Sequence, residues 1–264
     1  MKIAVIGGGN MGSAMVSAWL NKKICKPSDI LVYDKDADKR KKFDGFKIKT
    51  SINNFSKLSE CDVIVLAVKP QDMLKILDDM KSHLSKKSII ISIAAGITIK
   101  RISSVLGKIK IVRAMPNMPA QIGVGIVGWT AGDLTSTDKK TTQKLLGAMG
   151  YEVYFDKESK LDAVTAVSGS GPAYVFYFME ALFEAAYKLG LTNEEATSLA
   201  MGTFVGSSLM INISRESPKE LRKKVTSKKG TTEAAIKEFD KKNLKKIVLD
   251  AVKAAHKRAK ELNQ

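Results

Sequence analysis

Three observations predict an α/β protein in which a doubly wound, mainly parallel sheet is followed by an all-α dimerisation domain. Strand-like and helix-like segments alternate over roughly the first 150 residues, a pattern typical of a parallel sheet with helices on both faces. The first strand-like segment runs directly into a glycine-rich turn. From about Ser159 onward the strand pattern stops and helical periodicity replaces it. The predicted domains are therefore residues 1–157 and residues 158–264.

The expected elements of the first domain follow from apolar runs and from helical periodicity. Strands are expected at residues 2–6, 29–33, 62–68, 88–93, 110–114, 125–129 and 151–155. Helices are expected at residues 10–20, 37–42, 72–83, 100–106 and 136–149.

Two long helices, at residues 156–188 and 194–213, are expected to dominate the second domain. Thr192 and Glu195 form a capping box, and Ser217 followed by Pro218 is a second helix start. The long helices are rich in alanine, glycine, serine and aromatic residues. They carry more apolar surface than a domain of about a hundred residues can bury alone. A second subunit is therefore expected to cover them, which predicts a homodimer.

The composition is that of a soluble globular protein. Of the 264 residues, 44% are hydrophobic, enough for a sizeable core. The longest apolar stretches, residues 63–68 and 89–95, are too short to cross a membrane, and the N-terminus enters a strand rather than a signal peptide. We therefore expect a cytoplasmic protein with no membrane partner. The two cysteines and two widely spaced histidines predict neither a disulfide framework nor a metal site.

The net charge of +17 raises the question of a nucleic-acid partner. The lysines are spread along the whole chain on the polar sides of periodic segments. This distribution favours a solvated surface, which would attract an anionic cofactor and substrate, over a nucleic-acid interface.

The glycine-rich turn is the most informative motif. Gly7, Gly9 and Gly12 follow the buried-strand run 3–6 and precede a helical pattern. Glycines at this spacing allow a tight turn and bring backbone N–H groups to a pyrophosphate at the N-terminus of the helix. The sequence thus predicts a Rossmann-like, NAD(P)-binding first domain.

The end of the second strand bears on which dinucleotide binds. Asp34 lies where an acidic side chain accepts hydrogen bonds from the adenosine ribose, which favours NADH. A basic cluster follows and offers partners for the 2′-phosphate of NADPH; it comprises Lys35, Lys39, Arg40, Lys41 and Lys42. NADH and NADPH are both candidate cofactors, with a slight preference for NADH.

Small residues end the next two strands, at the sheet edge where open α/β folds bind ligands. These segments are 66–70 and 93–96. In the proline-flanked segment 113–119, Asn117 offers amide hydrogen bonds and is a predicted cofactor contact, although a rigid connector is the alternative.

Two motifs of the second domain indicate ligand contacts. Segment 168–174 places glycines and a proline inside a helical pattern, which favours close approach of Ser168 and Ser170 to substrate or nicotinamide over a packing kink. Gly230, Thr231 and Thr232 begin a helix with free N–H groups and two hydroxyls. Such a helix start suits a small carboxylate, a plain helix cap being the alternative.

In this order, the motifs resemble those of the pyrroline-5-carboxylate reductase family over nearly the whole chain. The resemblance implies a dimer, or a higher assembly of dimers, that reduces 1-pyrroline-5-carboxylate to L-proline with NADPH or NADH in the last step of proline biosynthesis. It implies cofactor contacts at Gly7, Gly8, Gly9, Asn10, Met11, Gly12, Asp34, Asn54, Ala67, Val68, Lys69 and Pro70, with Ala95 and Gly96 nearby. The substrate carboxylate would lie on Gly230, Thr231 and Thr232, the Thr232 hydroxyl acting catalytically near the ring nitrogen, and Glu158 would lie near the substrate.

One segment departs from the family pattern. The family reads Ser-Pro-Gly-Gly before the threonine pair, whereas this chain has Ser227-Lys228-Lys229-Gly230. The change puts the backbone shape of this substrate loop in question, and the two lysines add attraction for a carboxylate. Thr232, Glu158 and water all remain as proton donors. A β-hydroxyacid dehydrogenase or another imine reductase is the alternative activity, and a non-catalytic NAD(P)- or nucleic-acid-binding protein is the alternative class.

Overall fold

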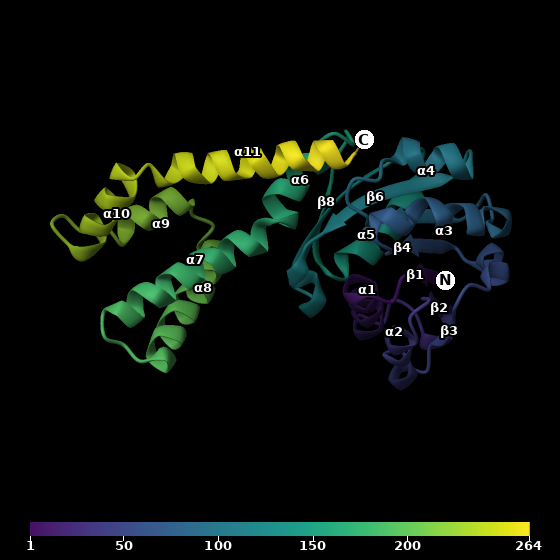
Figure 1. Cartoon of the computed structure of the whole chain (residues 1–264), viewed down its shortest axis with the longest axis horizontal. Helices are drawn as coiled ribbons and strands as arrows, with labels where there is room; N and C mark the ends of the chain where they lie inside the picture. The colour runs from purple at the N-terminus through teal and green to yellow at the C-terminus, as the bar shows by residue number, and fades with distance from the viewer. Residues whose placement is uncertain (264) are drawn as a thin grey trace. The chain divides into compact units, whose positions relative to one another are not determined.

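The computed structural model describes residues 1–263 and divides into two compact units (Figure 1). Unit 1 comprises Met1–Gly171 together with residues 255–263, and unit 2 comprises Pro172–Ala254. By compactness, the segment from residue 158 to residue 171 and the C-terminal end of the chain thus belong with the sheet. The chain crosses between the units inside two helices, near Gly171 and Ala255.

Unit 1 is built on one eight-stranded sheet with the strand order β3-β2-β1-β4-β5-β6-β7-β8. All neighbouring strands are parallel except β6 and β7, which are antiparallel. The predicted doubly wound, mainly parallel sheet is confirmed. The strands are β1 (Ile3–Ile6), β2 (Ile30–Tyr33), β3 (Lys49–Ser51), β4 (Val63–Leu66), β5 (Ile89–Ser92), β6 (Lys110–Pro116), β7 (Gly125–Ala131) and β8 (Gly150–Tyr154).

Strand β3 was not predicted from the sequence. It has three residues, Lys-Thr-Ser, and none is buried. A short polar edge strand has no apolar run to detect, because only its hydrogen bonds to β2 define it.

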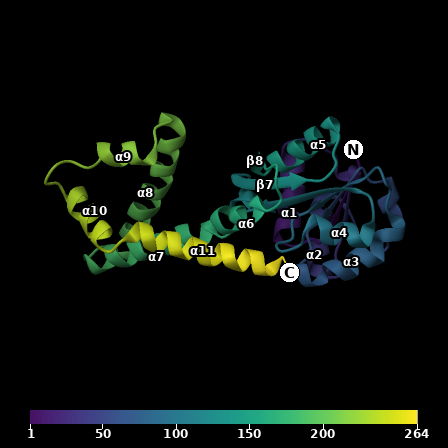
Figure 2. The same cartoon turned by 90° about the horizontal axis from the view of Figure 1, so that it is seen from above.

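Helices cover both faces of the sheet (Figure 2), and each face has its own apolar cluster. Helices α1 and α5 pack with Val5, Val32 and Val65, and the indole N–H of Trp19 on α1 donates to the carbonyl of Leu145 on α5 at 2.9 Å. Helices α3 and α4 pack on the other face with Ile6. The helices are α1 (Asn10–Asn21), α2 (Ala37–Lys41), α3 (Met73–Met80), α4 (Ile99–Leu106), α5 (Ser136–Gly147) and α6 (Lys160–Val164).

The single helix predicted for residues 156–188 is wrong. The chain forms α6, a π-helical segment (Thr165–Gly169) and then α7 (Gly171–Lys188). The N–H of Ser170 donates to the carbonyl of Thr165 at 2.8 Å, which is the wider π spacing. Pro172 has no N–H to continue an α-helical ladder, so the helix starts afresh at this point.

Unit 2 is helical, as predicted. It contains most of α7, then α8 (Asn193–Ser214), α9 (Pro218–Lys224), α10 (Thr231–Lys241) and the first half of α11 (Leu244–Leu262). The predicted capping box at Thr192 and the predicted helix start at Ser217 are both present, and Ser217 also forms a capping box with Glu220. Helix α8 buries only Ala196 and Ala200, and large apolar side chains such as Val205 are exposed. Among the described residues, α8 is also the one helix long and apolar enough to cross a membrane, which is weak evidence by itself.

Candidate active site

The turn between β1 and α1 brings backbone segments closer together than any side chain permits. Gly7 has a φ of +108°, and a Cβ there would lie 2.5 Å from the carbonyl oxygen of Ala67, at the end of β4. A Cβ on Gly12 would lie 2.0 Å from the carbonyl oxygen of Gly7. Two of the three predicted glycines are therefore required by packing inside the protein.

Gly9 differs because its Cβ position faces open space, with no atom within 4 Å. It is the N-cap of α1 in an extended conformation, and no side chain caps the helix. The N–H groups of the first turn are thus directed at an uncovered surface at the positive end of the helix. This arrangement fits a dinucleotide pyrophosphate, with Asn10 and Met11 in the first turn.

Asp34 organises the glycine-rich turn from the end of β2. Its Oδ2 accepts the N–H of Gly8 at 2.8 Å, and its Oδ1 accepts the N–H of Asp36 at 2.9 Å. The guanidinium of Arg40 donates to the main-chain oxygen of Asp34 at 2.7 Å. The carboxylate is therefore held in one orientation at the end of β2 by backbone donors.

Part of the basic cluster is engaged with nearby acids. Lys39 pairs with Asp36 on the α2 turn, and Lys41 pairs with Asp38. Lys35 reaches Asp72 at 3.8 Å and is 82% exposed. Arg40 is tied to the backbone of Asp34.

A cavity of about 230 Å³ adjoins Gly7 and Asp34. Tyr33 and Phe55 form one wall, their ring centroids 5.2 Å apart. Burial raises the pKa of Tyr33 to about 12, so its phenol stays neutral. Sequence reasoning missed most of the lining residues, including Ile52, Asn53, Asp72 and Lys75. Detecting β3 would have indicated the first two, because they follow that strand at the same sheet edge.

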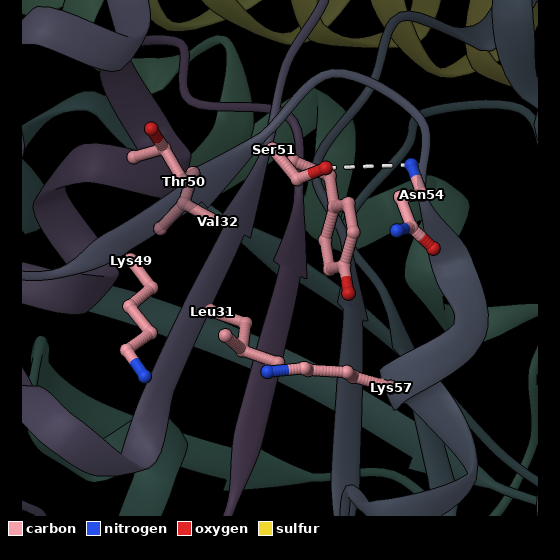
Figure 3. Close-up of a pocket in the computed structure, with 8 residues that line it drawn as sticks. Leu31, Val32, Lys49, Thr50, Ser51, Asn54 and Lys57 are labelled. Atoms are coloured by element: carbon pink, nitrogen blue, oxygen red, sulfur yellow. Dashed lines mark hydrogen bonds between the residues drawn. The ribbon is translucent and has the colours of Figure 1, made fainter.

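Asn54 lies beside this cavity in a neighbouring pocket formed by β2, β3 and Lys57 (Figure 3). Its N–H donates to the Ser51 hydroxyl at 3.3 Å, and its side-chain oxygen accepts the N–H of Ser56. Asn53, not Asn54, lines the cavity next to Asp34. The cofactor contact predicted for Asn54 stays a prediction.

The ends of β4 and β5 differ in what they contact. After β4, Ala67 packs against Gly7, and Lys69 and Pro70 begin a short helical turn. After β5, Gly96 has a φ of +73°, and a Cβ there would lie 2.5 Å from the carbonyl oxygen of Leu262. The C-terminal end of α11 therefore accounts for the glycine at position 96.

Two predicted site residues meet at the π-helix. The side-chain amide of Asn117 donates to the Ser168 hydroxyl at 3.4 Å, and its oxygen accepts the N–H of Ile126 at 3.0 Å. A Cβ on Gly169 would lie 2.7 Å from the methyl group of Met115, so glycine lets the π-helix pack closely on β6. Ser170 follows directly and is half-buried. π-Helical turns of this kind are frequent at functional sites.

Glu158 belongs to a polar network in unit 1. Its Oε1 accepts the N–H of Ile99 at 2.9 Å and the guanidinium of Arg113 at 3.0 Å. The sequence around Glu158 does not predict these partners, because both belong to segments far away in the chain. A substrate role for Glu158 stays a prediction.

The predicted carboxylate seat at the start of α10 lies in unit 2. Gly230 is an extended N-cap without a capping side chain, and its N–H donates to the carbonyl of Ser227. Lys229, which replaces a family glycine, has a φ of +61°. Its N–H donates to Glu233 at 2.9 Å, and this bond, with the ammonium of Lys237, lowers the pKa of Glu233.

Helices α1 and α10 thus share a feature. Their N-caps are glycines with no capping side chain. By contrast, side chains cap α2, α4, α5, α8 and α9. The first-turn N–H groups of α1 and α10 are available to anionic ligands. The described residues contain no group of three or more histidines, cysteines or acids that would hold a metal.

This sheet, its glycine-rich turn and the helical second domain define a nicotinamide-dinucleotide-dependent oxidoreductase. The family model described as pyrroline-5-carboxylate reductase dimerisation matches residues 158–262. A model described as NADP oxidoreductase, coenzyme F420-dependent, matches residues 2–96. The chain is 39% identical to a pyrroline-5-carboxylate reductase of Pseudomonas aeruginosa over 99% of this chain and 96% of the relative. It belongs to the pyrroline-5-carboxylate reductase family.

Solved structures of the same family resemble this chain along its whole length. The structure of a pyrroline-5-carboxylate reductase from Coxiella burnetii has a TM-score of 0.93 and 37% identity, covering 100% of this chain and 98% of the other. That of Plasmodium falciparum pyrroline carboxylate reductase with NADP bound has a TM-score of 0.88 and 30% identity, with coverages of 100% and 98%. A Streptomyces aurantiacus imine reductase, 15% identical with a TM-score of 0.56, covers 81% and 77% and shares the fold alone.

Proposed function

We propose that this chain catalyses the NAD(P)H-dependent reduction of 1-pyrroline-5-carboxylate to L-proline, the last step of proline biosynthesis. The observation that carries the proposal is the match to pyrroline-5-carboxylate reductases along essentially the whole chain. The two glycine-capped helices support it, because the cofactor pyrophosphate and the substrate carboxylate are both anions that need such donors.

The residues of the chain bind and orient the reactants. The turn 7–12 binds the pyrophosphate, and Asp34 holds that turn in place. Bound NAD(P)H supplies the chemistry, which is hydride transfer from C4 of its nicotinamide to the imine carbon. The first-turn N–H groups of α10 hold the substrate carboxylate, and the Thr232 hydroxyl hydrogen-bonds the ring nitrogen. A cyclic imine is basic enough to be substantially protonated near neutral pH, so orientation and exclusion of water suffice.

The helical domain provides the surface on which a partner subunit binds. The exposed apolar residues of α7 and α8 fall within the segment matched by the dimerisation model. We propose that a second copy of the chain, rather than a membrane, covers them. Assembly beyond the dimer and a cytoplasmic location stay predictions.

A three-arm assay tests this function. The purified chain is mixed with NADPH or NADH and 1-pyrroline-5-carboxylate, with NAD(P)⁺ and β-hydroxy acids, and with cofactor plus duplex DNA. Oxidation of the reduced cofactor with formation of proline in the first arm supports the proposal. Turnover confined to the hydroxy acids would assign the chain to the alternative dehydrogenase class, and DNA binding without turnover would make it a non-catalytic protein.

A further inference from the structure

The last residues of α11 are attached to the loop that follows β5. A Cβ on Gly96 would lie 2.5 Å from the carbonyl oxygen of Leu262 and 2.9 Å from its side chain, so the two backbones are in direct contact. Asn263, the next residue, contacts the sheet through Arg113 on β6. We call Leu262 and Asn263 the C-terminal latch.

Arg113 is the centre of this attachment. Its side chain is only 5% exposed. One guanidinium nitrogen donates to Glu158 at 3.0 Å, and the other donates to the Asn263 amide oxygen at 2.9 Å and lies 3.9 Å from Asp162. The Asn263 amide nitrogen in turn donates to Asp162 at 2.7 Å.

The network is closed because each polar group finds a partner. A buried guanidinium needs its donors satisfied, and an amide supplies both an acceptor for Arg113 and a donor for Asp162. Loss of the Asn263 amide would remove both hydrogen bonds at once and leave Arg113 and Asp162 without these partners in a poorly hydrated site.

The loop between β5 and α4, residues 93–98, is held at its middle and at its C-terminal end. Gly96 rests on Leu262, and the N–H of Ile99 that follows the loop is bonded to Glu158, which Arg113 fixes in place. The loop leaves the carboxyl end of β5, next to β4, at the sheet edge where dinucleotides bind. A displacement of the latch would therefore move backbone at this edge of the sheet.

We propose that Asn263 is a positioning residue for the cofactor site. Through Arg113 and Leu262, the C-terminal latch sets the conformation of residues 93–98 before NAD(P)H binds. This inference rests on the proposed function only in naming NAD(P)H as the ligand.

The test compares Asn263→Ala with the matched control Glu261→Ala. Glu261 lies on the same helix end and, among the residues that the structure describes, pairs only with Arg258, an exposed neighbour. Hydrogen exchange of the peptide spanning residues 93–99 is measured by mass spectrometry without cofactor, and the Kd for NADPH is measured by calorimetry. For Asn263→Ala we expect exchange at least threefold faster in this peptide and a Kd raised three- to tenfold. The control should match the wild type in both measurements.

Two further variants separate positioning from general loss of structure. Asn263→Gln keeps both amide atoms and should recover most of the NADPH affinity. Gly96→Ala perturbs the same contact from the loop side and should raise the Kd in the same direction. With saturating cofactor, kcat of Asn263→Ala should stay within twofold of the wild type while KM for NADPH rises.

Unchanged exchange in residues 93–99 together with an unchanged Kd for Asn263→Ala would overturn the proposal. Equal exchange increases along the whole of unit 1 would also overturn it, since they would indicate a purely structural role. Failure of the proposed function is a distinct result, because the wild type would then bind cofactor but would not reduce 1-pyrroline-5-carboxylate.

Discussion

Gly9 and Gly12 lie three residues apart in one motif, yet the structure predicts opposite consequences for their replacement by alanine. A methyl group on Gly9 meets no protein atom within 4 Å. Its φ of −68° and ψ of −171° are accessible to alanine. A methyl group on Gly12 would lie 2.0 Å from the carbonyl oxygen of Gly7. Only the second substitution conflicts with the fold itself.

The magnitudes follow from these contacts. For Gly9→Ala, the poorer N-cap costs about 0.5–1 kcal/mol, and the stiffer unfolded chain returns about 0.4–1 kcal/mol, so stability should barely change. The methyl group would hold the pyrophosphate off the first-turn donors, and each charge-assisted hydrogen bond contributes about 1.5–3 kcal/mol. Loss of one such bond raises the Kd for NADPH roughly tenfold or more.

For Gly12→Ala, a carbon–oxygen contact normally needs about 3.3 Å, so the backbone must move by roughly 1 Å. Overpacking of this kind costs about 1–3 kcal/mol of stability or more. Urea unfolding and calorimetric titration with NADPH measure the two effects separately. A Gly9→Ala protein that is stable and binds NADPH as tightly as the wild type would refute the assignment of this surface to the pyrophosphate.

Three further outcomes are expected. Replacing Asp34 by asparagine keeps an oxygen for the Gly8 N–H but removes a charge that repels a 2′-phosphate by about 1 kcal/mol. The ratio of kcat/KM for NADPH to kcat/KM for NADH should therefore rise roughly fivefold, and an unchanged ratio would show that Asp34 only supports the turn. Thr232→Ala should lower kcat roughly tenfold, because a hydrogen bond that strengthens in the transition state contributes about 1–3 kcal/mol. The exposed Thr137 on α5 provides the Thr→Ala control, and thermal melting checks the fold; a wild-type kcat for Thr232→Ala would contradict the role. Because the pKa of Glu233 is lowered, its stabilising bonds are present above the ordinary carboxyl range and are lost as the pH falls through the lowered pKa. The protection factor of the Lys229 N–H, measured by NMR relative to the intrinsic exchange rate at each pH, should therefore fall on acidification in the wild type but not in Glu233→Gln.

Much of the fold follows from local patterns. Buried parallel strands such as β1 and β4 are continuous apolar runs, and helices such as α8 begin at capping boxes. These signals are contained in neighbouring residues, so the sequence alone was sufficient to find them. The glycine spacing likewise predicted the turn between β1 and α1, because the conformation of that turn depends on residues that are close together in the sequence.

Contacts between distant segments were decided only by the tertiary structure. The reason for the glycine at position 96 is Leu262, which lies at the other end of the chain. The partners of Arg113 come from two separate segments, Glu158 and Asp162 at the start of α6 and Asn263 after α11, and no local pattern links either segment to β6. The same holds for Asn117 and Ser168.

The amino-acid sequence by itself determined the fold class, the order of the motifs and the expected chemistry, because each depends on side-chain type and short-range spacing. The tertiary structure alone decided which glycines serve packing and which leaves its Cβ position open, because Gly7, Gly9 and Gly12 look alike until the atoms around each Cβ position are known. It also decided that the C-terminal latch meets the loop after β5, because burial of a charged group requires partners that folding gathers from across the chain.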